Sequence, residues 1–285
     1  MKLFSLVCSA LAAAASFGAG TLFLSPPQWE LSSRHVVHGM PRTLDDRYVI
    51  DGAGDEKQSL SLLGREGFVI GYSNKYRIAV FVSMQWTQSL YEASKGAAGG
   101  DRVYRPDPDL PSYGRGTPDF ENATSGLQRG HLARHADNRA WGEDNVEMGN
   151  LVSNLGPMSK SLNEGVWGVL EDAHRTIVTN KAFGSSIWVI SGAVLPKNER
   201  FEFLKNGVVV PKAYYKIFAW YDRAGAFQNR GYMIPQTAGK EPPVDFLTPI
   251  DVIEDLTGLD FFPKLADGVE NSVEAAKHTT MWPAR

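Results

Sequence analysis

The chain has 285 residues, with 29 Lys and Arg against 32 Asp and Glu, and a formal net charge of −3 at pH 7. A mildly acidic protein does not bind polyanions through its overall charge, so contact with nucleic acid would need a local cluster of cations. The one cysteine, Cys8, excludes an intrachain disulfide and a thiolate zinc site, which leaves oxygen and nitrogen ligands for any metal ion.

The chain begins with an apolar leader. Met1-Lys2 precedes a run without charged residues from Leu3 to Leu24, with small residues toward its end. This pattern predicts a secretory signal peptide over residues 1–24, and hence a secreted, periplasmic or otherwise extracytoplasmic protein. The alternative is a retained anchor that tethers the protein to a membrane, since about twenty uncharged residues can span a bilayer.

Residues 25–64 are polar, contain Pro26-Pro27 and show little periodicity, so they predict an extended N-terminal segment. His35 and His38 lie three positions apart in it, but no other ligand is nearby and we expect no metal there. Residues 65–285 are long enough to form one large domain with its own core.

Strand patterns run through this domain. Residues 68–72 and 76–83 are rich in β-branched and aromatic side chains and flank the turn residues Ser73-Asn74-Lys75, which predicts a hairpin. Further strands of the same sheet system are predicted at 187–194, 208–210 with 212–220, and 228–234.

Two other segments carry loop and helix signals. Residues 93–126 are rich in Gly, Pro, Asp and Ser, which predicts a long surface loop. Near the C-terminus, Thr248 before Pro249 predicts the start of a helix, and Gly258 predicts its end.

Residues 163–177 have helical periodicity. The predicted core face consists of Val166, Val169, Leu170, Ala173 and Ile177. A second stripe at successive i+4 steps consists of Asn163, Trp167, Glu171 and Arg175. An ordinary amphipathic helix would also give this pattern, with a Glu171–Arg175 pair that contributes roughly a few tenths of a kcal/mol. Gly165 and Gly168 would each cost such a helix about 1 kcal/mol relative to alanine.

Arg129-Gly130-His131 supplies the residue types that phosphodiester cleavage needs. Arginine offers a planar, permanently charged fork for a phosphate, and histidine accepts a proton near neutral pH. The glycine between them allows a tight bend or a close approach to a ligand. Taken alone, the triplet is weak evidence, because a surface turn with an exposed histidine can have the same sequence.

The triplet does not stand alone. With Ser153-Asn154, Leu162-Asn163-Glu164-Gly165-Val166-Trp167 and Leu170-Glu171 followed by Arg175, it resembles the DNA/RNA non-specific endonucleases. This is the ββα-metal or His-Me finger group, which includes mitochondrial endonuclease G. Other matching segments follow in order between about residues 65 and 265. The resemblance implies an α+β fold of the ββα-metal type, with a central, mainly antiparallel sheet system, flanking helices, and strands on both sides of the catalytic helix.

The resemblance also implies roles for the site residues. His131 is expected to be the general base, and Asn163 to bind Mg²⁺, with Mn²⁺ as an alternative. Arg129 and Arg175 are expected to clamp phosphate. Glu171 would hold a metal-bound water or an arginine, and Asn154 would support the site or contact substrate. The products of similar enzymes carry 5′-phosphate ends.

One position departs from the family pattern. The motif usually begins with aspartate, whereas this chain has Gln128, which can donate and accept hydrogen bonds but carries no charge. The alternative to a working nuclease is therefore a catalytically weakened relative that binds nucleic acid. A serine esterase is a third reading. Such enzymes carry their nucleophile in a Gly-x-Ser-x-Gly motif, and the most similar stretch here, Gly71-Tyr72-Ser73-Asn74-Lys75, lacks the second glycine.

Nothing in the sequence suggests a motif that reads base edges, so the expected partners are the DNA and RNA backbones. This predicts weak sequence preference and inhibition by salt. His135 and His174 could be a second ligand or base, or packing residues beside the site. A homodimer and a dedicated inhibitor protein are compatible with the sequence. The cations available for phosphate are Arg102, Arg105, Arg129, Arg134, Arg139 and Arg175.

Overall fold

The computed structural model describes residues 33–45, 47–48, 60–97, 102–112, 114–120, 126–180 and 183–282. The predicted signal peptide and parts of the predicted loop over residues 93–126 lie outside these ranges. Within them, no helix combines the length and the apolar character needed to cross a membrane.

The centre of the fold is a six-stranded antiparallel sheet in the order β11-β10-β7-β4-β3-β2. The strands are β2 (Leu60–Gly64), β3 (Val69–Ser73), β4 (Ile78–Thr87), β7 (Phe183–Val194), β10 (Ala213–Asp222) and β11 (Phe227–Pro235). The predicted hairpin is confirmed as β3–β4. The sheet begins within the predicted N-terminal segment, because β2 pairs with β3 and its residues Leu60 and Leu63 are buried.

Short elements flank this sheet. The N-terminal part of the chain forms η1 (Ser33–Val36) and β1 (Arg42–Thr43), and β1 pairs with β12 (Leu259–Asp260). The predicted strand at 208–210 does not join the large sheet, since β9 (Val209–Val210) pairs with β8 (Glu202–Phe203).

The C-terminal part adds η6 (Pro243–Phe246), α7 (Ile250–Thr257) and α8 (Asp267–Glu274). Gly258 ends α7 in the left-handed conformation, with φ 70°, as predicted. Thr248 does not cap this helix. Its amide donates instead to the Gly231 carbonyl at 2.8 Å, and Pro249 is the N-cap residue.

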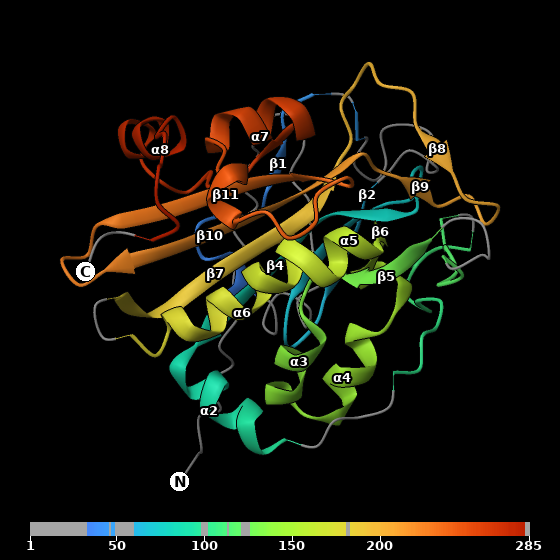
Figure 1. The fold of residues 1–285 in the computed structure, drawn as a ribbon, viewed down its shortest axis with the longest axis horizontal. Helices are drawn as coiled ribbons and strands as arrows, with labels where there is room; N and C mark the ends of the chain where they lie inside the picture. The colour runs from blue at the N-terminus through green and yellow to red at the C-terminus, as the bar shows by residue number, and fades with distance from the viewer. Residues whose placement is uncertain are drawn as a thin grey trace, which may run out of the picture.

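Consecutive residues of β10 point to opposite faces of the sheet. The ring of Tyr214 lies against Trp167, with 5.9 Å between centroids, and the ring of Tyr215 lies against Phe261, at 5.2 Å. Figure 1 shows the two helical layers that follow from this, with α7 and α8 on one side of the sheet and the helices of residues 88–177 on the other.

The outer edge of β11 is covered by the chain itself. Tyr232 forms an antiparallel bridge with Leu247 beside the bond between Thr248 and Gly231. Farther along the strand, the Arg230 side chain donates through Nε to the Thr280 carbonyl at 3.0 Å.

The second layer contains a ββα unit. Strand β5 (Leu127–His131) pairs antiparallel with β6 (Leu155–Ser159), and a long helix follows. That helix comprises α5 (Lys160–Leu162), a π-helical turn η5 (Asn163–Trp167) and α6 (Gly168–Ile177). The remaining elements of this layer are α2 (Gln88–Gly96), α3 (His135–Asn138), η3 (Arg139–Trp141), α4 (Glu143–Gly149) and η4 (Val152–Asn154).

The π-helical turn changes which side chains face the core. Val166 and Leu170 are buried as predicted, but Val169 is 50% exposed and Trp167, assigned to the second stripe, is fully buried. The uniform 3.6-residue period fails because Gly165 leaves helical geometry, with φ −102° and ψ −123°. A π turn adds a residue to the helix and so rotates everything after it.

Gly165 meets another backbone at this point. The Val166 amide donates to the Gly239 carbonyl at 2.7 Å, and a Cβ atom on residue 165 would lie 1.9 Å from the same oxygen. No side chain fits there unless one of the two segments moves.

We therefore predict that Gly165→Ala lowers the free energy of unfolding by about 1–3 kcal/mol, the usual cost of overpacking. Urea unfolding followed by circular dichroism measures this. Gly168→Ala is the matched control, because a Cβ atom on residue 168 would have the Asn163 carbonyl oxygen as its nearest neighbour, at 3.5 Å, an ordinary van der Waals distance. That variant should be as stable as the natural chain or more stable, since alanine favours helix. Equal stability of the two variants would contradict the close contact at Gly165.

Candidate active site

His131 ends β5 and is held on several sides. Its Nε2 lies 3.1 Å from Asn150 Oδ1, and its carbonyl oxygen accepts the indole N–H of Trp167 at 3.1 Å. The rings of Tyr104 and His135 lie 6.0 and 5.5 Å from its own ring, centroid to centroid. A carboxamide oxygen can only accept, so Nε2 carries the hydrogen and Nδ1 keeps the lone pair that can take a proton.

The protonation state of His131 suits a base. Burial lowers the pKa of its imidazole from 6.5 to about 4, and the positive charges of His135 and Arg102 act in the same direction. The hydrogen bond to Asn150 opposes this shift. The imidazole is therefore neutral throughout the neutral pH range, as a general base must be.

A chain of three side chains orients Asn163. Gln128 Nε2 donates to Glu164 Oε1 at 2.7 Å, and Asn163 Nδ2 donates to Gln128 Oε1 at 2.8 Å. An ionised Glu164 can only accept, so it fixes which end of the Gln128 amide faces it. Gln128 then presents its oxygen to Asn163 and engages that residue's amide nitrogen. We call these residues the 164–128–163 relay.

The relay leaves the oxygen of Asn163 available as a ligand. Asn163 is half-buried in the π-helical turn, and Glu164 beside it is exposed. A neutral carboxamide oxygen next to a carboxylate is a hard donor set, which suits Mg²⁺ or Mn²⁺. The residues present therefore fit the metal that the resemblance implies, and Gln128 still accepts from Asn163 as an aspartate would.

Glu171 lies beside an arginine. Its Oε2 is 3.7 Å from Arg134 Nε, and Arg134 also donates to the Glu171 carbonyl at 3.0 Å and to Asp172 at 2.6 Å. Of the two alternatives predicted for Glu171, this contact favours holding an arginine. Burial raises the pKa of the Glu171 carboxyl, and the charges of Lys216 and Arg134 oppose that rise.

Lys216 is a residue that the sequence analysis missed. It is buried on β10, with its Nζ 4.0 Å from the centroid of a Trp167 ring, and burial lowers its pKa. The signal was present, since a single lysine interrupts an otherwise apolar strand. A cation over the indole face helps to fix Trp167, whose N–H holds the His131 carbonyl.

The two predicted phosphate-clamp arginines lie in different surroundings. Arg129 donates to the Pro118 carbonyl at 2.6 Å, and its guanidinium lies 4.8 Å from the ring of Tyr104, next to His131. Arg175 turns toward α2, where it donates to Ser94 at 2.9 Å, and its Nε lies 3.5 Å from Asp137 Oδ1. The structure thus brings Arg129, and not Arg175, to the surroundings of His131, and a clamp role for Arg175 stays a prediction.

Asn154 is placed as a support. It is fully buried, accepts the Ala133 amide at 2.8 Å, and donates to the carbonyls of Ala133 and Gly149 at 2.8 and 2.9 Å. These bonds fix the turn that follows His131. Of the two roles predicted for Asn154, these contacts and its burial favour support of the site, and a substrate contact stays a prediction.

The neighbouring histidines and arginines differ in their surroundings. His174 is buried, and its Nε2 lies 2.6 Å from Asp137 Oδ2, as expected of a packing residue. His135 is buried beside His131. Of the arginines predicted to meet phosphate, Arg105 pairs with Glu147 at 3.1 Å, and Arg134 pairs with acidic groups on α6.

We predict that the His131 imidazole stays neutral down to about pH 4. An NMR titration of its carbon-bound ring protons measures the midpoint directly. The unfolded chain takes up this proton near the ordinary pKa of 6.5 and the folded chain does not, so His131 makes folding less favourable as the pH falls from 6.5 toward 4. A titration midpoint near 6.5 would contradict the burial described above.

The chain is similar in sequence to known nucleases. The chain is 28% identical over 265 residues to a nuclease of Nostoc sp., which covers 88% of this chain and 89% of that protein. It is 28% identical over 218 residues to mitochondrial endonuclease G of Homo sapiens, which covers 72% of this chain and 70% of that protein.

The fold has a solved counterpart. A crystal structure of an EndoG/EndoGI complex superimposes with a TM-score of 0.67 at 20% identity, covering 86% of this chain and 95% of that one. The two proteins therefore share the ββα-metal fold over most of this chain. The model of the DNA/RNA non-specific endonuclease family matches residues 53–268, and the chain therefore belongs to that family.

Proposed function

We propose that this protein hydrolyses phosphodiester bonds of both DNA and RNA with one divalent metal ion and leaves 5′-phosphate ends. The observation that carries the proposal is the pair of oriented groups in the ββα unit. Asn150 leaves Nδ1 of a neutral His131 free to accept a proton, and the 164–128–163 relay leaves the Asn163 oxygen free to bind a cation.

The residues divide the chemistry between them. Nδ1 of His131 takes the proton of an attacking water, and Arg129, whose guanidinium lies 4.8 Å from the Tyr104 ring beside His131, holds the phosphate. Trp167 keeps the base in position through its bond to the His131 carbonyl. When bound at Asn163, Mg²⁺, or Mn²⁺ in its place, would neutralise phosphate charge and stabilise the departing 3′ oxygen.

The partners we propose are the DNA and RNA backbones, because contacts to phosphate carry no base information. The predicted signal peptide supports an extracytoplasmic location. If that leader is retained, it would tether the protein to a membrane. An inhibitor protein is proposed by analogy with the EndoG/EndoGI complex. The competing function is a catalytically weakened relative that binds nucleic acid without efficient cleavage.

We expect the natural chain to degrade plasmid DNA and RNA with Mg²⁺ and to stop when a chelator is added. His131→Ala should lower the rate by about 10²–10⁴-fold, the usual contribution of a general base. Gel-based digestion measures both effects. His278→Ala is the matched control, since this half-buried histidine lies in the C-terminal segment, near Arg230. Binding of DNA without cleavage by the natural chain would favour the weakened relative.

A second prediction concerns the relay. Glu164→Gln replaces a group that can only accept with an amide that can also donate, so residue 164 no longer fixes which end of the Gln128 amide faces it. The concentration of Mg²⁺ that gives half-maximal activity should therefore rise by about 10-fold, as for other residues that orient metal ligands. Gln128→Asp combined with Glu164→Gln restores an acceptor for Asn163 and should recover most of this loss.

Initial rates over an Mg²⁺ titration measure both variants. Glu202→Gln, which changes an exposed carboxylate on β8, is the control and should behave like the natural chain. Equal Mg²⁺ requirements in the natural chain and in Glu164→Gln would show that the relay does not orient Asn163.

A further inference from the structure

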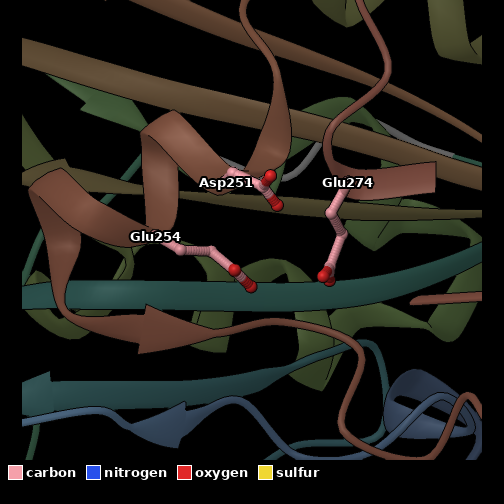
Figure 2. A group of neighbouring side chains, drawn as sticks. All are labelled: Asp251, Glu254 and Glu274. Atoms are coloured by element: carbon pink, nitrogen blue, oxygen red, sulfur yellow. The ribbon is translucent and has the colours of Figure 1, made fainter. Parts of the chain in front are cut away.

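A second group of carboxylates lies far from the ββα unit in the fold. Asp251 and Glu254 come from α7, and Glu274 comes from the last turn of α8. Each offers one oxygen, and the three oxygens lie within 4.8 Å of one another. Figure 2 shows the three side chains turned toward one another between the two helices. We call Asp251, Glu254 and Glu274 the α7–α8 carboxylate cluster.

Glu274 points to a missing ligand. Its side chain is only 5% exposed, and its Oε1 is buried without a hydrogen-bond partner among the described residues. Burying a carboxylate oxygen in this way is costly unless a cation or a donor compensates for the lost water. Glu254, in contrast, is oriented by the Phe261 amide, which donates to its Oε1 at 2.8 Å.

The surroundings are negative as well. Asp260 and Glu270 also lie close enough to act on Glu254 and Glu274. Arg42 offsets the charges of Asp260 and Glu270. Burial, with help from the neighbouring carboxylates, raises the pKa of Glu254 to about 8 and that of Glu274 to about 9. A bound proton or a metal ion would reduce the repulsion among these carboxylates.

The donor set suits Ca²⁺ better than Mg²⁺. Three carboxylate oxygens within 4.8 Å of one another can share one Ca²⁺ ion, whose ligands lie about 2.3–2.6 Å from it, whereas Mg²⁺ requires near-ideal octahedral geometry at about 2.1 Å. Ca²⁺ also accepts six to eight oxygen ligands in flexible geometry, so water could complete the shell.

We propose that Asp251, Glu254 and Glu274 bind a calcium ion that fastens α8 to α7. The site is separate from Asn163, because α7 and α8 cover the opposite face of the sheet (Figure 1). Beyond α8 the chain reaches Trp282, whose ring lies 5.4 Å from Phe218 and 5.9 Å from Trp220, centroid to centroid. Calcium would thus stabilise the C-terminal segment against the sheet.

The test uses the full chain carrying Asn163→Ala, so that calcium does not report on the active site. Equilibrium dialysis against Ca²⁺ should find one ion bound per chain. Thermal unfolding should show a rise in Tm of at least roughly 3 °C at a Ca²⁺ concentration about ten times the Kd. Adding Glu254→Gln and Glu274→Gln should abolish both effects. When a chelator removes Ca²⁺, the Glu254→Gln and Glu274→Gln substitutions should leave Tm unchanged or raise it, because they remove carboxylates that repel one another.

Two further variants test whether the carboxylates of the cluster themselves bind the ion. Asp251→Asn changes an exposed ligand without disturbing the interior, and it should weaken Ca²⁺ binding by at least about 10-fold. Asp245→Asn, at an exposed carboxylate on η6 outside the cluster, should leave binding unchanged. If the Asn163→Ala chain binds no Ca²⁺, or if binding survives in the variants of the cluster, the proposal is overturned and protons alone balance these carboxylates.

Discussion

The helix that carries Asn163 and Glu171 lies where it does because residue 165 has no side chain. The Val166 amide bonds to the Gly239 carbonyl, and the π-helical turn formed there sends Trp167 inward. The indole then contacts the His131 carbonyl on one side and Lys216 on the other. The strand bearing His131 and the helix bearing Asn163 are thus positioned together by one contact between two backbones.

Orientation at the site comes from groups with a fixed hydrogen-bonding character. Glu164 can only accept, as can the oxygen of Asn150, so each determines the hydrogen position of the side chain beside it. Neither needs to touch the substrate for this purpose. Gln128 thus presents an acceptor to Asn163 without a charge of its own, and the negative charge in this set of hydrogen bonds lies on Glu164. The departure from the family pattern changes where the charge lies and keeps the acceptor that faces Asn163.

Local patterns in the sequence were sufficient for much of this structure. The hairpin β3–β4, the strands β7, β10 and β11, and the helix end at Gly258 follow from side chains close in sequence. The resemblance of the motif segments supplied the fold class and the family, which the fold and the comparisons confirm.

Long-range contacts were the part that could not be predicted. Gln128 and Glu164 are 36 positions apart, so neither local sequence predicts the hydrogen bond between them. The exposure of Val169 and the burial of Trp167 depend on Gly239, a residue outside the helix. Lys216 reads as an irregularity in a strand until Trp167 and Glu171 are placed beside it. The α7–α8 carboxylate cluster likewise joins residues that share no local pattern.

The covered edge of β11 bears on how copies of this chain could associate. An unpaired strand edge invites another molecule to extend the sheet, and proteins commonly block such edges. Here Leu247 and Thr248 already pair with the outer side of β11, and Thr280 binds its Arg230 side chain. A second molecule that extended the sheet at this edge would first have to displace Leu247 and Thr248 from β11. Any dimer of the intact chain is therefore expected to form through side-chain surfaces or another edge, and not by adding a strand to β11.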